Sequence, residues 1–422
     1  MRPSRIVVQI AHALTIVLGV VAVVAALALI RLAPDRRTDF SIFYRSALAW
    51  RMGGTMYPTD RVNLNLPAVV VAYAPLTYVS TRTAQTIFTL LGVACAFISS
   101  RWITKAIPMT PPFVLASIVL AVDAGWINLW LEQEGLLLML VVTAAWIADR
   151  EHRDLSAGAW AGLAIYTKPF LAVLILYWSW RRCWRRIGAT FATGCVLLLV
   201  GAVLAGPASY LSWWRSLGLA PAPYAPLNAS LLGLWSRTFF GSEFAPALIR
   251  QPIPVLITAW GLSVVALLWA IFRRIAADRD DVDRAWALVL IGSLLASPLG
   301  WIYYLPIAAG PLLACVGGFI SWACVWASLV ILLLLRSEVL VALHTSGVGA
   351  IVLGSIHFWV LLLIFIAALI GVPESGRRLG RFADETTSDA HRLEEAVVVA
   401  PRPISLVSLV SVVFSRRQSR DR

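Results

Sequence analysis

Long apolar runs that recur along almost the whole chain constrain its fold more than any other feature. Charged or Pro/Gly breaks divide them into these candidate spans: 6–30, 84–100, 112–131, 135–148, 155–168, 169–181, 187–205, 252–272, 285–297, 303–318, 319–335 and 347–371. Because lipid tails offer no hydrogen-bond partner, such segments cross a bilayer as helices. The sequence therefore predicts an all-α polytopic membrane protein with about 11–12 transmembrane helices. Several spans within 135–181 are short, so we expect helices there to be broken or to enter the bundle part-way.

The first run, Ile6 to Ile30, follows the basic residues Arg2 and Arg5. A cleaved signal peptide is the alternative interpretation. The run is too long for a signal core and lacks a clear small-residue cleavage site before Arg31, so a retained first helix is expected.

The composition agrees with a chain that is solvated by lipid. Sixty per cent of the residues are hydrophobic and 14% are charged, whereas a soluble domain carries about 25% charged residues. The net charge of +13 is mostly arginine, which the positive-inside rule explains without a nucleic-acid partner. The five cysteines are scattered and show no metal-ligand spacing. We therefore expect a bilayer as partner and no metal or other cofactor, while the oligomeric state is not indicated.

Arginine clusters in alternate connections set the expected orientation. They are Arg101 with Lys105, Arg150 with Arg153, Arg181 to Arg186, and Arg273-Arg274. Placing them in the cytoplasm puts both termini inside and the long connections 31–83 and 206–251 outside. The prediction is a multi-pass plasma-membrane protein with one transmembrane domain, residues 1–371, whose long loops face the periplasm or cell exterior. Residues 372–422 are expected to form a disordered basic cytoplasmic tail.

A segment in the first outside loop carries a carboxylate among cations. Phe40, Phe43 and Tyr44 recur at helical spacing, which predicts an interfacial amphipathic helix that begins near Asp39. Two interpretations of Asp39 stay open. It can be the N-cap of that helix, or a base that accepts a proton from a positioned hydroxyl. The neighbouring Arg36, Arg37 and Arg45 would keep it ionised and could hold a phosphate leaving group.

Two further connections carry polar residues between apolar helices. Lys168 precedes Pro169, and a lysine in that setting either snorkels to the interface or meets an anion. In Glu132-Gln133-Glu134-Gly135, solvation of a loop explains the two carboxylates most simply. Gln133 could instead hydrogen-bond a sugar hydroxyl.

Two aromatic-rich segments complete the set of candidate residues. The 206–251 connection contains Asn228 and Ser230 among tryptophans, and Trp301 and Tyr303 follow Ser297-Pro298. Aromatic side chains are expected in the interface belt of any membrane protein. Stacking against a carbohydrate is the sharper alternative.

These pieces, in this order, resemble the polyprenol-phosphate-mannose-dependent mannosyltransferases of the GT-C superfamily, glycosyltransferase family 87. The matching residues are Asp39-Phe40, Tyr44, Ala47, Gly53, Tyr57-Pro58, Pro75-Leu76, Gln133, Gly162, Lys168-Pro169, Asn228, Ser230-Leu231, Gly233, Ser297-Pro298 and Trp301. The sequence departs from the family pattern beside Gln133, where Glu132 and Gly135 replace the usual glycine and asparagine. It also has Tyr303 and Tyr304 where the family often has histidine.

The resemblance implies a GT-C-like bundle with a long first outside loop and Asp39 as the catalytic base. The implied activity is inverting, metal-independent transfer of a sugar, with mannose as the expected one. The donor would be a polyprenyl phosphate, and the acceptor a glycolipid or glycan of the cell envelope. The residues expected to bind the donor phosphate are Lys168, Arg36, Arg37 and Arg45. Those expected to bind the sugar or acceptor are Tyr44, Gln133, Asn228, Ser230, Trp301 and Tyr303.

The sequence also allows two rival functions. A transporter or lipid flippase needs ionisable groups near the bilayer centre, and Asp123 is the main candidate for one. A non-catalytic scaffold of envelope assembly would keep the fold without turnover.

Overall fold

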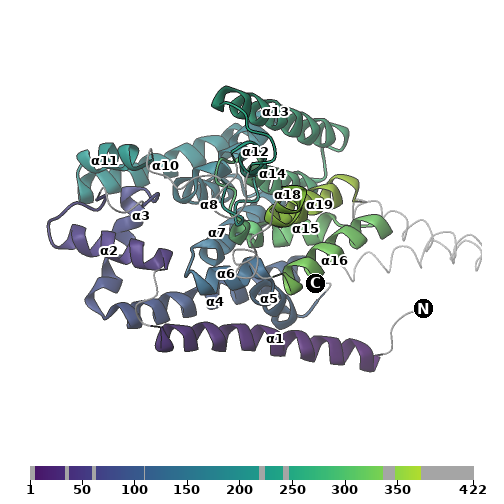
Figure 1. Cartoon of the computed structure of the whole chain (residues 1–422), viewed down its shortest axis with the longest axis horizontal. Coiled ribbons are helices and arrows are strands. Elements are labelled where there is room, and N and C mark those ends of the chain that lie inside the picture. The colour runs from purple at the N-terminus through teal and green to yellow at the C-terminus, as the bar shows by residue number, and fades with distance from the viewer. Residues whose placement is uncertain are drawn as a thin grey trace, which may run out of the picture. The chain divides into compact units, whose positions relative to one another are not determined.

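The computed structural model describes residues 5–33, 38–58, 63–108, 110–217, 224–240, 247–335 and 347–371. Within these ranges the chain is helical, and its only β feature is an isolated bridge between Asn228 and Trp301. Figure 1 shows the helices packed as one bundle. The predicted all-α polytopic membrane fold is therefore confirmed. Arg36, Arg37 and the predicted tail 372–422 lie outside the described residues.

The helices of the first half are α1 (Arg5–Leu32), α2 (Asp39–Arg51), α3 (Pro67–Ala72), η1 (Ala74–Tyr78), α4 (Thr81–Ala106), α5 (Pro112–Ala121), α6 (Asp123–Trp130), α7 (Gly135–Arg150), α8 (Asp154–Thr167), η2 (Pro169–Ala172), α9 (Val173–Trp180) and α10 (Trp184–Ala205). Those of the second half are α11 (Ala208–Leu217), α12 (Leu231–Phe239), α13 (Ile253–Ala277), α14 (Val282–Ala296), η3 (Ile302–Ala308), α15 (Ala309–Cys315), α16 (Phe319–Leu334), α18 (Gly347–Gly354) and α19 (Ile356–Ile370).

Fewer helices are long enough to cross a membrane than the roughly 11–12 spans that the sequence predicts. In the described ranges, four helices are long and apolar enough to span a bilayer, within α1, α4, α10 and α13. The pair α5–α6, bent by 72°, adds a fifth if it is one broken span. Five further apolar helices are shorter, between 10 and 17 residues. The predicted count of 11–12 included such short helices, so that number stays a prediction.

Burial separates the lipid-facing helices from the centre of the bundle. In the apolar windows of α1, α10 and α13, between 11% and 22% of the residues are buried, which is the pattern of helices that face lipid. By contrast, α14 is buried along almost its whole length, from Arg284 to Leu295. Helix α7 packs on α4, α8, α14 and η3. Both ends of α7 are therefore fixed inside the protein, and its first residues can position a site.

The amphipathic helix expected in the first outside loop is present as α2, but its environment differs from the expectation. Thr38 is its N-cap, because the Thr38 hydroxyl accepts a hydrogen bond from the backbone N–H of Ser41. The interpretation of Asp39 as the cap is therefore wrong. The apolar face of α2 packs on protein rather than lipid, since the ring of Phe40 lies 4.9 Å from Phe88 of α4 and 6.1 Å from Tyr73.

The ends of α7, α8 and α14 that lie away from Asp39 are held by ion pairs. Arg186 pairs with Asp149 and, at 2.8 Å, with Asp154. Arg150 pairs with Asp283 at 3.0 Å. These arginines belong to the clusters that the sequence assigns to the cytoplasm.

Candidate active site

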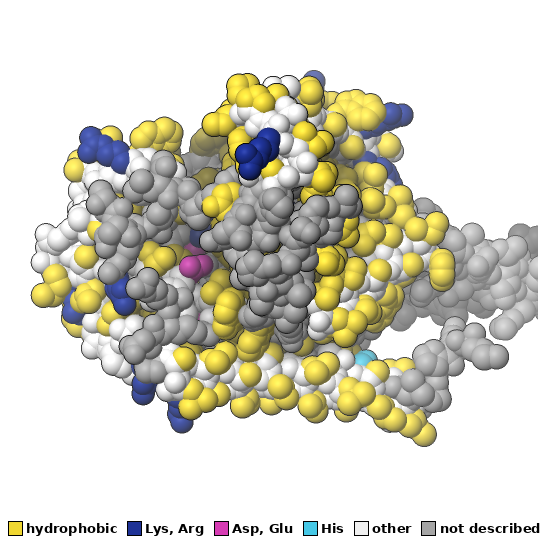
Figure 2. All heavy atoms as spheres, viewed as in Figure 1, with side chains coloured by type: hydrophobic (Ala, Val, Ile, Leu, Met, Phe, Trp, Pro, Cys, Tyr) yellow, Lys and Arg dark blue, Asp and Glu magenta, His cyan; other side chains and the backbone are white. Residues whose placement is uncertain are grey.

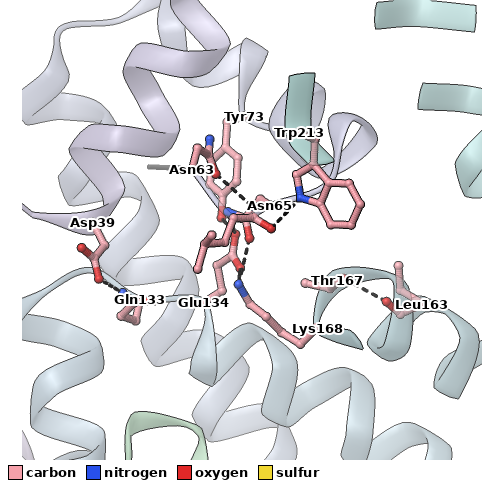
Figure 3. Close-up of polar contacts among 11 residues, drawn as sticks. Asp39, Asn63, Asn65, Tyr73, Gln133, Glu134, Leu163, Thr167, Lys168 and Trp213 are labelled. Atoms are coloured by element: carbon pink, nitrogen blue, oxygen red, sulfur yellow. Dashed lines mark hydrogen bonds and ion pairs between the residues drawn. The ribbon is translucent and has the colours of Figure 1, made fainter. Parts of the chain in front are cut away.

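The carboxylate of Asp39 lies in the first turn of α2, where the chain is tied to the end of α6. The Asp39 backbone N–H donates to the carbonyl of Leu131 at 3.2 Å. The side-chain amide of Gln133 donates to Asp39 Oδ2, as Figure 3 shows. Burial raises the pKa of Asp39 from 3.8 to about 6, against the opposing effects of Gln133 and Lys168. A half-buried carboxylate with this pKa is ionised at neutral pH and is a stronger base than a solvated aspartate.

The tripeptide Glu132-Gln133-Glu134 between α6 and α7 organises the site. All three side chains are buried, with 1%, 4% and 2% of each residue exposed. Glu132 adopts a left-handed backbone conformation with φ of 56°, and its carboxylate accepts from the Thr38 hydroxyl at 2.9 Å. The expectation that these carboxylates merely solvate a loop is wrong. The turn instead holds the start of α2 through Thr38 and orients Asp39 through Gln133.

Glu134 connects three segments that are distant in the sequence. Its carboxylate accepts from the Tyr73 hydroxyl and, at 3.0 Å, from the side-chain amide of Asn65. Lys168 Nζ lies 2.7 Å from Glu134 Oε2 and donates to Asn65 Oδ1 at 2.8 Å. Figure 3 shows Lys168 pointing toward Glu134 and Asn65. Lys168 therefore meets an anion of its own chain and does not snorkel.

Pro169 explains why Lys168 points into this cluster. Helix α8 ends at Thr167, and Lys168 is extended, with φ of −138° and ψ of 95°. Proline disfavours helical backbone at the preceding residue, so the chain leaves the helix at Lys168 and directs the side chain away from the axis of α8. The ring centroid of Tyr304 lies 5.6 Å from Lys168 Nζ and adds a cation–π contact.

Asn65, Tyr73 and Glu134 are the site residues that sequence reasoning missed. Asn65 and Glu134 lie 69 positions apart, and Asn65 and Lys168 lie 103 apart, so no local pattern links them. One signal was present: Asn63 and Asn65 alternate with leucines just before Pro67, which is unusual for a loop that leads into an apolar helix.

Asn228 and Ser230 connect two loops rather than lining an open surface. The Asn228 amide donates to the carbonyl of Pro298, and its oxygen accepts from the backbone N–H groups of Ser230 and Gly300. Ser230 caps α12 by accepting from the N–H of Gly233. Both residues are fully buried. Their observed role is to fix the 297–302 loop, and sugar binding by these two residues stays a prediction.

The loop that Asn228 fixes carries Trp301 and Tyr303. The two rings stack, with centroids 6.0 Å apart and an interplanar angle of 13°. Trp301 is half-buried and Tyr303 is 5% exposed. Tyr303 also lies within electrostatic range of Asp39. The structure thus brings the half-buried face of Trp301 and the base to the same region.

Two other predicted site residues lie further along α2. Arg45 is exposed on α2. The Tyr44 hydroxyl donates to the carbonyl of Val79 at 2.9 Å and the residue is 7% exposed. Tyr44 therefore contributes to packing of α2, and Lys168 is the described cation that lies in the cluster.

Asp123, the candidate for a mid-membrane charge in a transporter, has a partner on another helix. Its carboxylate lies 3.0 Å from His357 Nε2, and His357 Nδ1 lies 3.0 Å from the carbonyl of Pro226. Both side chains are almost fully buried. The pair links the bend between α5 and α6 to α19, which is a structural function.

An apolar groove begins at the cluster around Glu134. Its volume is about 310 Å³, and its walls come from α3, α4, α7, α8 and α10. Glu134, Tyr166 and Thr167 line it at the ends of α7 and α8 nearest the cluster, while Val141 and Leu163 line it further along these helices. Figure 2 shows a hollow in one face of the molecule, with acidic atoms at its base and Lys or Arg atoms beside them. The groove thus reaches Glu134, whose carboxylate pairs with Lys168, and the neighbouring Gln133 contacts Asp39.

Comparison with known proteins identifies the family. The family model described as glycosyltransferase family 87 matches residues 63–299. A polyprenol-phosphate-mannose-dependent alpha-(1-2)-phosphatidylinositol mannoside mannosyltransferase of Mycobacterium tuberculosis (strain ATCC 25618 / H37Rv) is 25% identical over 299 residues, which cover 64% of this chain and 67% of the relative. No solved structure matches. The family match includes Gln133 and Lys168 and begins after Asp39. Because it spans more than half of the 422 residues, the chain belongs to glycosyltransferase family 87.

Proposed function

We propose that this membrane glycosyltransferase moves a sugar, with mannose as the expected one, from a polyprenyl phosphate to a glycolipid or glycan acceptor of the cell envelope. The observation that carries the proposal is that three features adjoin: the apolar groove that reaches Glu134, Lys168 paired with Glu134, and Asp39 bonded to the neighbouring Gln133. A polyprenyl-phosphate sugar has the same order of lipid tail, phosphate and sugar. The relative that is named for a polyprenol-phosphate-mannose donor supports the same substrate class.

The groove suits an isoprenoid tail. Its lining is almost entirely apolar, with Phe88, Leu138 and Leu163 among the wall residues. Burying a hydrocarbon tail there releases its apolar surface from water at about 25 cal/mol per Å². The phosphate would then meet Lys168 where the groove ends.

Asp39 is the best of the three carboxylates for the role of base. The carboxylate of Glu134 already accepts hydrogen bonds from Tyr73 and Asn65 and pairs with Lys168. Glu132 is 1% exposed and holds the N-cap of α2. Asp39 is half-buried and is oriented through one oxygen by Gln133. It can therefore approach an acceptor hydroxyl with its other oxygen.

The reaction follows from these positions. Asp39 removes the proton of the acceptor hydroxyl, and the resulting oxygen attacks the anomeric carbon from the face opposite the phosphate. The bond between that carbon and the phosphate oxygen breaks, and its electron pair stays on the phosphate. A phosphate leaves without a proton, so a general acid is not required. A single displacement inverts the configuration at the anomeric carbon.

The placement of charge supports an active site at the outer face. Glu134 and Lys168 lie at the start of α7 and the end of α8, while Arg150 and Arg153 lie where α7 ends and α8 begins. If arginine clusters mark the cytoplasm, the site faces the periplasm or cell exterior.

The test is transfer by Asp39→Asn and Asp39→Ala in membranes supplied with a labelled polyprenyl-phosphate mannose. Loss of a general base lowers turnover by about 10²–10⁴-fold. Asp280→Asn is the matched control, because Asp280 is exposed beyond the far end of the bundle from Asp39, and it should transfer at the wild-type rate. Undiminished transfer by folded Asp39 variants would overturn the proposal.

A further inference from the structure

Glu134 places a buried negative charge beside the lysine that is proposed to hold the donor phosphate. Lys168 Nζ lies 2.7 Å from its carboxylate, and the side chain of Glu134 is 3% exposed. The Tyr73 hydroxyl and the Asn65 amide hold the same carboxylate from other sides. Glu134 therefore cannot move away from Lys168 without losing two further hydrogen bonds.

The proposed reaction changes the charge of the phosphate by one unit. The donor is a phosphodiester and carries one negative charge. When the bond to the anomeric carbon breaks, the electron pair remains on the phosphate oxygen, and the product is a phosphomonoester with two negative charges. The proton from the acceptor hydroxyl is then on Asp39, so charge and atoms balance.

The described residues of the cluster do not supply a second positive charge for the product. Lys168 is the cation there, and it already faces the carboxylate of Glu134. Asp39 lies close enough that both Lys168 and Glu134 affect the pKa of Asp39. A phosphate oxygen bonded to Lys168 would lie within about 5.5 Å of the Glu134 carboxylate, given charge-assisted hydrogen bonds of ordinary length. At this separation, in a partly buried site, like charges repel appreciably.

We propose that Glu134 is a charge-selective residue, which lets the phosphate site accept the singly charged donor and favours release of the doubly charged product. This inference rests on the proposed function and adds to it a preference for binding of the donor and release of the product. A lysine without Glu134 would bind the dianion more tightly than the monoanion, and the spent lipid phosphate would then inhibit the enzyme. With Glu134 in place, the site holds the doubly charged product less tightly than Lys168 alone would hold it.

A measurement on the wild-type protein tests the inference without any variant. The probes are farnesyl phosphate and farnesyl methyl phosphate, which share one tail and carry two charges and one charge at about pH 8. Each is used as a competitive inhibitor of transfer from a labelled polyprenyl-phosphate mannose. We expect the singly charged probe to bind about tenfold more tightly than the doubly charged one. Equal binding, or tighter binding of the dianion, would overturn the inference.

A charge-removing substitution supplies the second test. In Glu134→Gln, the inhibition constant for farnesyl phosphate should fall about tenfold relative to that for farnesyl methyl phosphate. Glu134→Asp keeps the charge and should restore the wild-type ratio. Glu151→Gln is the matched control, because Glu151 is 56% exposed at the other end of α7. A ratio that is the same in wild type and Glu134→Gln would contradict the role of Glu134.

These outcomes are distinct from failure of the proposed function. If the wild-type protein transfers no sugar from the labelled donor, the proposed function itself fails. If it transfers sugar but does not discriminate between the two probes, the proposed function stands and the charge selection by Glu134 is wrong.

Discussion

Gln133 donates a hydrogen bond to the carboxylate of Asp39, although the two residues are 94 positions apart in the sequence. The bond joins the turn that precedes α7 to the first turn of α2. It also opposes the effect of burial on the pKa of Asp39. The orientation and the basicity of the proposed base therefore depend on one amide side chain.

Replacing Gln133 with alanine should move the acidic limb of the pH–rate profile. In the wild type, Asp39 with a pKa of about 6 must be ionised to act, so turnover should fall as the pH drops through this value. Loss of the Gln133 hydrogen bond removes an effect that lowers the pKa, so the limb should shift to higher pH in Gln133→Ala. Turnover of labelled donor across pH measures the shift. A limb at an unchanged pH would contradict the role of Gln133.

The same pKa predicts that Asp39 lowers the stability of the fold at neutral pH. The pKa of the Asp39 carboxyl is 3.8 in the unfolded chain and about 6 in the folded one. The unfolding free energy of the protein therefore falls as the pH rises from the first value to the second. Asp39→Asn cannot ionise, so its unfolding free energy should exceed that of the wild type by on the order of 1 kcal/mol above about pH 7.

Thermal unfolding in detergent at two pH values checks this prediction. The difference in Tm between Asp39→Asn and wild type should be positive at about pH 8 and should vanish near pH 4, where both side chains are neutral. A variant that is inactive and also less stable at both values would mean that Asp39 is mainly structural.

The sequence predicts the helical elements of this site better than their contacts. The helix that begins at Asp39, the break at Lys168-Pro169 and the turn at Glu132 to Glu134 all follow from local patterns. The identity of the N-cap residue does not follow from a local pattern, because Thr38 and Asp39 are both good caps. The burial of Asp39 beside Gln133 decides between them. The partner of Lys168 also depends on long-range packing, since Asn65 and Glu134 reach it from distant segments.

The Glu134–Lys168 pair should show strong coupling in stability. Lys168→Met leaves the Glu134 carboxylate buried without its ammonium partner, which costs about 3–5 kcal/mol. Glu134→Gln with Lys168→Met removes both charges and should recover most of this loss. Chemical unfolding of both single variants and the double variant gives the coupling free energy. Additive losses would show that the two charges do not depend on each other.

Substitution of Asn228 should mainly lower stability, whereas substitution of Trp301 should mainly weaken substrate binding. Asn228→Ala leaves the N–H of Gly300 without its partner and the carbonyl of Pro298 with only the Ser230 hydroxyl, so we expect a loss of about 1–3 kcal/mol in unfolding free energy. Trp301→Ala removes a half-buried ring and should mainly raise the KM for donor or acceptor. Trp326→Ala is its control, since Trp326 is 59% exposed on α16. Equal losses of stability in the Asn228 and Trp301 variants would contradict this division.

The groove predicts a dependence on the length of the lipid tail. Leu163 lines it about one turn from the Glu134 cluster, and a tryptophan at this position would fill much of the channel beyond the phosphate. Leu163→Trp should therefore raise the KM for a long-chain polyprenyl-phosphate donor by about tenfold or more, because buried apolar contact is lost. A short-chain donor ends before the obstruction, so its KM should change little. Leu155→Trp is the control on the same helix, because Leu155 is 69% exposed and does not line the groove. If Leu163→Trp raised the KM of short and long donors equally, the substitution would be acting on the phosphate site, and the tail would lie elsewhere.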